Sequence, residues 1–219
     1  LALLSEAGIL VAENEGWCAV TQPAVADPHS KLAVLQATHG NLPELRLLAR
    51  CGERLSEVLR GVQEPLELLF PGGNDETVRQ LYTQSPVLQA GNHLLAQTIE
   101  QIVAQLPTGQ GLRILEIGAG TGSTTAALLS HLPATQTNYL FTDIGATFLT
   151  QARATFADYD FVRYQPLDIE QAPDEQGFAR QQADLVVAAN VLHATKDLGK
   201  TLGHTRQLLA PGGLLLLLE

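Results

Sequence analysis

Five short apolar segments alternate with helical stretches after about residue 111. The apolar segments predict strands at Arg113–Ile117, Asn138–Thr142, Phe161–Pro166, Asp184–Ala189 and Leu214–Leu218. Helices are expected between most of them, at about 122–132, 146–157 and 197–209. This alternation is typical of a parallel sheet with helices on both faces. In such open α/β sheets, ligands bind beyond the carboxyl ends of the strands.

The sequence before residue 107 has a different pattern and is mostly helical. Residues 1–8 resemble the end of a helix, and two short strands at 8–12 and 17–20 flank an expected hairpin turn at 13–16. Trp17 is expected to lie in a core. Further helices are predicted at 28–39, at 44–60 and from Ser85-Pro86, where Ser caps the helix and Pro occupies the first turn. We expect one unit at 1–106 and a second at 107–219.

A glycine-rich segment, Glu-Ile-Gly-Ala-Gly-Thr-Gly, begins at Glu116, where the first strand of the predicted sheet ends and a helix starts. Dinucleotide-binding folds use G-x-G-x-x-G/A. The glycines here are Gly118, Gly120 and Gly122, which gives G-x-G-x-G. Position 123, where the dinucleotide pattern has Gly or Ala, is Ser123. Glycines let a backbone approach its ligand closely. The carboxylate of Glu116 would repel a pyrophosphate, but it suits a ligand that carries an ammonium and a sulfonium group.

Polar residues follow the next three strands at the same edge of the sheet. Asp143 ends the second strand and could accept hydrogen bonds from ribose hydroxyls, with Ile144 beside it, or it could cap the following helix. Asp168 could accept a bond from an adenine amino group while Ile169 covers the ring; the alternative is an ordinary turn aspartate. Asn190 follows the fourth strand and is expected to face the same crevice.

Charge and cysteine content exclude several classes of protein. The net charge is −10 and there is no cluster of Lys and Arg, so nucleic acids and anionic membranes are poor candidate partners. The sequence contains no run of 18 apolar residues, so no membrane-spanning helix is predicted. The cysteines, Cys18 and Cys51, form no C-x-x-C pair, which argues against zinc and against a disulfide framework and suits the cytoplasm. We expect no metal.

These features resemble the class I S-adenosylmethionine (SAM) dependent methyltransferases over roughly residues 86–219. The resemblance is sharper to the C-methyltransferase domains of polyketide synthases, through Val187–Thr195 (VAANVLHAT), Leu66–Gly73, Tyr82–Pro86, Phe178-Ala179 and 184–187. It implies a Rossmann-like doubly wound parallel sheet, an N-terminal helical lid, SAM as cofactor and S-adenosylhomocysteine as product. The cofactor-binding residues expected are Glu116, Gly118, Ala119, Gly120, Gly122, Asp143, Ile144, Asp168, Ile169 and Asn190.

Methyl transfer to a carbon between a ketone and a thioester requires a base that titrates near neutrality. His193, just beyond the fourth strand, is the candidate base. Glu219 ends the fifth strand and could fix the imidazole tautomer; the resemblance gives this pair the same roles. By resemblance, Tyr82 of the lid could reach the substrate carbonyl or the methyl donor; the alternative is a half-buried tyrosine on an amphipathic helix. The remaining histidines are expected to be structural or superficial: His29, His39, His93, His131 and His204.

The resemblance implies a β-ketoacyl chain carried on the phosphopantetheine arm of an acyl carrier domain and methylated at its α-carbon, within a multidomain synthase. Two alternatives stay open: an O- or N-methyltransferase of a natural-product pathway, and a non-catalytic methyltransferase-like domain. A nicotinamide-dependent reductase is disfavoured by the glycine spacing.

The two ends of the sequence suggest a piece of a larger polypeptide; the alternative is a trimmed tag and a disordered tail. There is no methionine, so Leu1 is not an ordinary translation start, and the sequence stops at the fifth predicted strand. This fold normally adds two more strands. We expect further residues or a second chain to supply them, unless the domain boundary is unusual.

Overall fold

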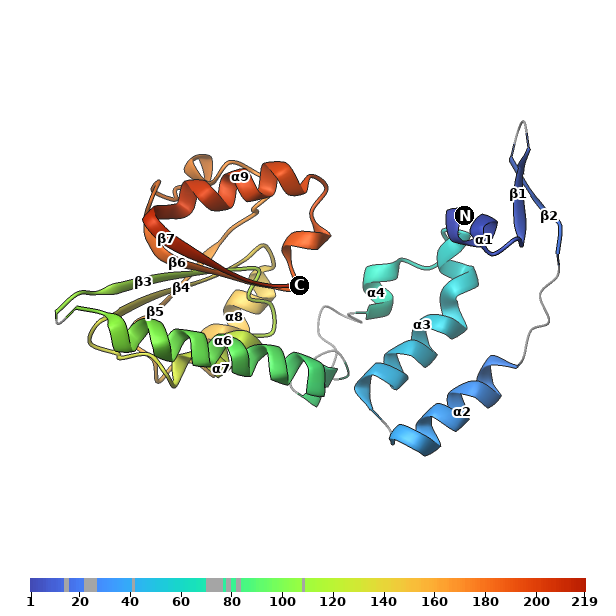
Figure 1. The fold of residues 1–219 in the computed structure, drawn as a ribbon, viewed down its shortest axis with the longest axis horizontal. Coiled ribbons are helices and arrows are strands. Elements are labelled where there is room, and N and C mark those ends of the chain that lie inside the picture. Colours follow the sequence, from blue (N-terminus) through green and yellow to red (C-terminus); the bar gives the residue numbers. More distant parts are fainter. Residues whose placement is uncertain are drawn as a thin grey trace.

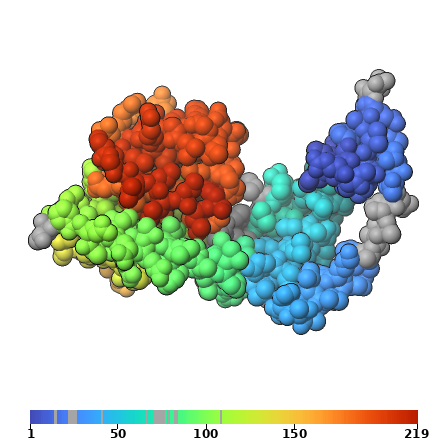
Figure 2. Space-filling model, viewed as in Figure 1, coloured from blue at the N-terminus to red at the C-terminus, as the bar shows by residue number. Residues whose placement is uncertain are grey.

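The computed structural model describes residues 1–13, 16–21, 27–40, 42–69, 77, 80–81, 84–107 and 109–219. Figure 1 shows two groups of elements, one helix-rich and containing the N-terminus, the other built around a sheet that ends at the C-terminus. The space-filling view shows them as two lobes (Figure 2). No helix in the described part of the chain is both long and apolar enough to cross a membrane.

The N-terminal region, residues 1–69, has a short hairpin and helices. Its elements are α1 (Ala2–Glu6), β1 (Leu10–Glu13), β2 (Gly16–Ala19), α2 (Pro28–His39), α3 (Pro43–Leu59) and α4 (Pro65–Leu69). The two strands pair antiparallel, and Asp27 caps α2 by accepting bonds from the amides of His29 and Ser30. The expectation that Trp17 is a core residue is wrong, because 43% of it is exposed. Every described residue of β1 and β2 is exposed or half-buried.

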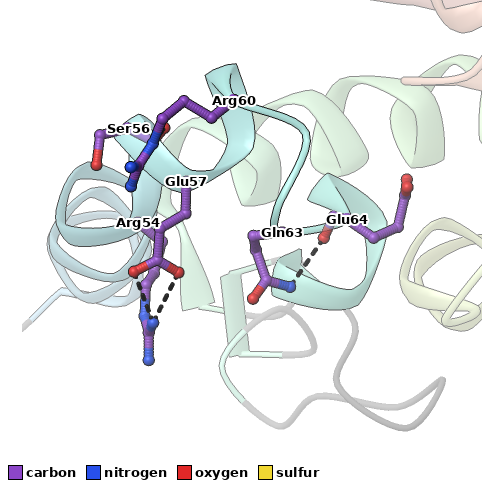
Figure 3. A network of polar contacts seen from close by, with 6 residues as sticks. All are labelled: Arg54, Ser56, Glu57, Arg60, Gln63 and Glu64. Carbon is purple, nitrogen blue, oxygen red and sulfur yellow. Dashed lines mark hydrogen bonds and ion pairs between the residues drawn. The ribbon is translucent and has the colours of Figure 1, made fainter.

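Polar bonds at the end of α3 are local and lie at the surface (Figure 3). Arg54 Nη1 donates to both carboxylate oxygens of Glu57, at 3.0 and 2.8 Å. Arg60 Nε donates to the Ser56 carbonyl at 3.1 Å. In the turn to α4, Gln63 Nε2 donates to the carbonyl of the following residue at 3.2 Å. Exposed ion pairs stabilise a fold by about 1 kcal/mol or less, so these bonds order the turn but contribute little stability.

The second group is an open parallel sheet, as predicted. Its strands are β3 (Leu112–Ile117), β4 (Thr137–Asp143), β5 (Val162–Pro166), β6 (Ala183–Ala189) and β7 (Leu209–Leu218). They run in the order β5-β4-β3-β6-β7, and every neighbouring pair is parallel. The order reverses at β3, so β4 and β6 flank this strand and the crevice opens beyond its end.

Strand β7 begins at Leu209, earlier than the Leu214 predicted from the apolar run. The Pro-Gly-Gly sequence at 211–213 is typical of a turn. The register between β6 and β7 shifts between Ala183 and Leu185, however, and this irregularity accommodates the turn-like residues inside the strand. Gly213 is required there, because a Cβ would lie 2.9 Å from the Ala210 carbonyl oxygen.

Helices cover both faces of the sheet (Figure 1). On one face, α6 (Pro86–Gln105), α7 (Ser123–Leu129) and α8 (Ala146–Thr155) contribute Ile99, Leu128 and Leu149 to one core cluster. On the other face, α9 (Leu198–Leu208) contributes Leu208 to a second cluster. Helix α6 therefore packs with the sheet although it precedes the boundary expected near residue 107. The division of the chain at that residue stays a prediction.

Candidate active site

The glycine-rich loop joins β3 to α7, and its three glycines all have a positive φ. A Cβ on Gly118 would lie 2.3 Å from Cγ2 of Val191, and one on Gly122 would lie 2.8 Å from Cε2 of Phe156. Beside Gly120 the nearest atom to such a Cβ is a loop carbonyl oxygen at 3.8 Å. Two of the glycines therefore make room for neighbouring side chains. Gly120 is the one that leaves the backbone open to a ligand.

Glu116 points away from the crevice, into the core beneath α7. The residue is 1% exposed, and its Oε2 accepts bonds from Thr125 Oγ1 at 2.5 Å and from the Tyr139 hydroxyl at 2.7 Å. Burial raises its pKa to about 7, against the effect of both hydroxyl bonds and together with the nearby Asp143 charge. Direct contact with a positively charged cofactor was expected, but the structure places this carboxyl behind the loop, because side chains alternate faces along a strand.

Asp143, at the end of β4, holds two loops at once. Its Oδ2 accepts a bond from the Gly120 amide at 2.9 Å, and its Oδ1 accepts one from the Gly145 amide at 2.7 Å. Burial raises the pKa of this carboxyl, although both amide bonds oppose the shift. The N-cap of α8 is Gly145, so Asp143 is not that cap. Its oxygens retain free lone pairs that could accept ribose hydroxyls.

The crevice beyond β3, β4, β5 and β6 contains a pocket of about 400 Å³, within the range of roughly 300–1,000 Å³ that small-molecule sites occupy. Its walls bring together most of the predicted cofactor residues: Gly118, Asp143, Ile144, Asp168, Ile169 and Asn190. A smaller pocket adjoins it, lined by Ala119, Gly120 and again Asn190. Asn190 has a positive φ of 53°, uncommon for a residue other than glycine. Such strain is frequent at functional sites.

Two residues support the β5 end of this pocket, and sequence reasoning missed the first of them, Gln176. Gln176 accepts a bond from the Asp168 amide and donates one to the Asp168 carbonyl, both at 2.8 Å. His204, buried on α9, donates from Nδ1 to the Ile169 carbonyl at 2.8 Å. It is therefore a satisfied structural histidine, as expected. No sequence pattern marks Gln176, because the contact depends on how a short helical turn (Pro173–Gln176) folds back on the strand.

His193 and Glu219 lie side by side, beyond the adjacent strands β6 and β7. Nδ1 of His193 hydrogen-bonds with Oε2 of Glu219. The other carboxylate oxygen accepts bonds from the amides of Leu192 at 2.8 Å and Val191 at 3.3 Å. Burial acts to raise the pKa of Glu219, but the bonds from His193 and the two amides outweigh it and lower the pKa. The carboxylate thus stays ionised and orients the imidazole.

The third predicted catalytic residue, Tyr82, lies outside the described residues. Among those described, no group of three or more His, Cys, Asp and Glu side chains is arranged to hold a metal ion.

Residues 115–215 match the family model described as "Methyltransferase domain". A curated relative, the non-reducing polyketide synthase ausA of Aspergillus calidoustus, is 35% identical over 227 residues. That match covers 100% of this chain and 9% of the synthase, so the chain corresponds to a small part of that relative's length.

Solved structures share the same fold. The CurJ carbon methyltransferase is 45% identical, with a TM-score of 0.89 over 99% of this chain and 58% of that one. The trans-methyltransferase CalH, in complex with S-adenosylhomocysteine, is 32% identical, with a TM-score of 0.67 over 86% of this chain and 52% of that one. The fold is that of the SAM-dependent methyltransferases. Residues 115–215 therefore belong to the methyltransferase-domain family, and the chain is homologous to the carbon methyltransferases of polyketide synthases.

Proposed function

We propose that this chain methylates the α-carbon of a β-ketoacyl thioester carried on the phosphopantetheine arm of an acyl carrier domain, with SAM as methyl donor. The observation that carries the proposal is the contact between His193 and Glu219 at the strand ends next to the cofactor crevice. The likeness to the CurJ carbon methyltransferase supports carbon as the acceptor.

The volume of the crevice and the chemistry of its walls suit SAM. Gly120 leaves open space beside the loop, Asp143 and Asp168 supply acceptors for hydroxyl and amino groups, and Ile144 and Ile169 supply apolar walls. Glu116 supports the loop from behind through α7. When bound, SAM supplies an electrophilic methyl group and leaves as S-adenosylhomocysteine.

His193 acts as the general base. With Nδ1 committed to Glu219, Nε2 is the nitrogen that accepts the proton from the carbon between the ketone and the thioester carbonyl. The electron pair left on that carbon then forms the new carbon–carbon bond. Glu219 keeps the neutral imidazole in the tautomer with Nδ1 protonated and stabilises the imidazolium that forms. Two backbone amides hold the carboxylate, so it cannot rotate away easily.

The acceptor is proposed to arrive on a carrier domain of the same synthase, with neighbouring synthase domains as further partners. The net charge of −10 offers no attraction for an acidic carrier. Tethering within one polypeptide supplies an effective concentration without strong binding.

The test is mass spectrometry of a β-ketoacyl thioester incubated with SAM and the protein. We expect a gain of one methyl group on the α-carbon. His193→Ala should lower the rate by about 10²–10⁴-fold, whereas the control His39→Ala, on exposed α2, should not change it. His193→Ala at full rate would refute the base assignment.

The same measurement separates the alternatives. A methyl group found on oxygen or nitrogen would identify an O- or N-methyltransferase. Bound SAM with no product from any acceptor would identify a non-catalytic domain.

A further inference from the structure

Helix α6 contacts both halves of the site through two consecutive residues. Asn92 faces the first turn of α7, which follows the glycine-rich loop. Gly91 faces Leu218, the residue before Glu219. Both residues of α6 are buried.

The first turn of α7 has no side-chain cap of its own. Its N-cap is Gly122, which has no side chain to accept the orphan amides of the helix. Asn92 reaches across from α6 and bonds the side-chain hydroxyls of this turn, not its amides. Its Nδ2 donates to Ser123 Oγ at 3.3 Å, and its Oδ1 accepts from Thr124 Oγ1 at 2.9 Å. Ser123 and Thr124 line the pocket beside Gly120, so this amide fixes one wall of the cofactor loop.

Gly91 lets α6 lie close to the end of β7. A Cβ at this position would lie 2.7 Å from Cδ2 of Leu218 and 3.0 Å from its Cδ1. The carbonyl of Leu218 accepts a bond from the Asn190 amide at 2.7 Å, so this end of β7 is also tied to the crevice. Any shift of Leu218 would be transmitted to Glu219, the next residue, and hence to its contact with His193.

We propose that α6 positions both halves of the active site: Asn92 positions the cofactor loop, and Gly91 positions the strand end that carries Glu219. The second part rests on the proposed function, since it requires Glu219 to act in catalysis. The first part requires only that the crevice binds SAM.

Asn92 is tested by a double-mutant cycle with Asn92→Leu and Thr124→Val, both close in shape to the residues that they replace. Calorimetry would measure the affinity for S-adenosylhomocysteine, and hydrogen exchange of the cofactor-free protein would measure the protection of amides 118–124. We expect about tenfold weaker binding for Asn92→Leu, because a loop that Asn92 no longer holds must be ordered when the cofactor binds, at a cost of about 1.4 kcal/mol. The protection of the loop should fall as well. The double variant should be no weaker than Asn92→Leu alone.

Gly91→Ala tests the other half, with Gly203→Ala on α9 as the control, because nothing lies within 4 Å of a Cβ there. We expect Gly91→Ala to lower kcat for methyl transfer about tenfold, with the affinity for S-adenosylhomocysteine unchanged. Adding Leu218→Val removes both Cδ atoms that the new Cβ meets, and it should restore most of the rate.

If α6 has only a structural role, different results are expected. In that case Asn92→Leu would lower the melting temperature and leave both the affinity and the loop protection unchanged, which would overturn the first part. Gly91→Ala with an unchanged kcat, or a loss that Leu218→Val does not restore, would overturn the second. A wild-type protein that binds S-adenosylhomocysteine but methylates no carbon would refute the proposed function while leaving the Asn92 result intact.

Discussion

The glycine-rich loop and the His193–Glu219 pair lie at neighbouring positions on one edge of the sheet, but they are built differently. The loop is supported from behind by the buried Glu116 and from the side by Asp143, through bonds of 2.5–2.9 Å. The His193 side chain is 61% exposed, and that of Glu219 is 23% exposed.

The site therefore has two halves. The cofactor half is the glycine-rich loop, and the base half is the His193–Glu219 pair. The cofactor half has its geometry set by core packing before any ligand arrives. In the base half, two backbone amides hold the carboxylate and the carboxylate holds the imidazole. The imidazole nevertheless faces solvent, where an acceptor can reach it. Covering that half would strengthen its electrostatic interactions, because charges interact more strongly away from water.

The largest effect is expected from breaking the base half alone. Glu219→Gln should lower the rate of methyl transfer by on the order of 10²–10³-fold, because the amide can neither stabilise the imidazolium nor fix the tautomer as a carboxylate does. The affinity for S-adenosylhomocysteine should stay within twofold of wild type. Turnover assays and calorimetry measure the two quantities, with the exposed Glu53→Gln on α3 as control. A matching loss of affinity would show that the two halves are not separate.

Gly118→Ala should break the cofactor half. Its φ of +59° costs a residue with a Cβ about 1–2 kcal/mol, and the clash with Val191 adds about 1–3 kcal/mol of strain. We therefore expect urea unfolding to show a stability about 2–5 kcal/mol lower, together with loss of cofactor affinity.

The matched variant Gly120→Ala has a similar φ of +54° but faces open space. It should lose affinity with a stability loss of only about 1–2 kcal/mol. Equal destabilisation by the two variants would contradict the packing difference between these glycines.

Much of this arrangement could be predicted from the sequence, because it depends on strand order and on local pattern. Apolar segments separated by helices indicated the parallel sheet, and the ends of adjacent strands meet at one edge, so residues following β6 and β7 were expected to approach each other. His193 and Glu219 do so. The direction of the Glu116 side chain could also have been predicted, because alternation along the strand places it on the same face as Ile114.

Other features depend on contacts that no local pattern records. Asn92 meets Thr124 across 32 positions of sequence, and Tyr139 meets Glu116 across 23. The early start of β7 was missed because the turn-forming residues at 211–213 fit into an irregular stretch of the strand. In the N-terminal region, apolar periodicity predicted α3 but not what covers it, and Leu48, Leu55 and Leu59 are exposed among the described residues.

A third prediction concerns pH and the buried support of the loop. The pKa of Glu116 is about 7 in the folded chain, against an ordinary 4.5. Between these values the folded state retains a proton that the unfolded state has released. The Glu116 contribution to stability is therefore fully present below pH 4.5 and is lost as the pH rises through 7, a fall on the order of 3 kcal/mol.

Glu116→Gln stays neutral and should remove most of this fall, so that the free energy of unfolding varies less between pH 5 and pH 8. The raised pKa of Asp143 acts in the same direction and should leave a smaller slope. Denaturant titrations across this range would check the result. Glu53→Gln should retain the wild-type slope, and a Glu116→Gln profile parallel to wild type would contradict the buried position of this carboxyl.

The smallest effect is expected at Ile144, in the wall of the cofactor half. Ile144 lines the pocket but is 71% exposed, so the fold gains little from it and a bound cofactor could bury it. Ile144→Ala should change the free energy of unfolding by less than about 0.5 kcal/mol. The affinity for S-adenosylhomocysteine should fall about three- to tenfold, because burying part of an isoleucine is worth roughly 1 kcal/mol. Calorimetry and urea unfolding on the same sample separate the two effects. An unchanged affinity would mean that the cofactor leaves Ile144 in solvent, and that the apolar wall of the cofactor half is formed by Ile169 instead.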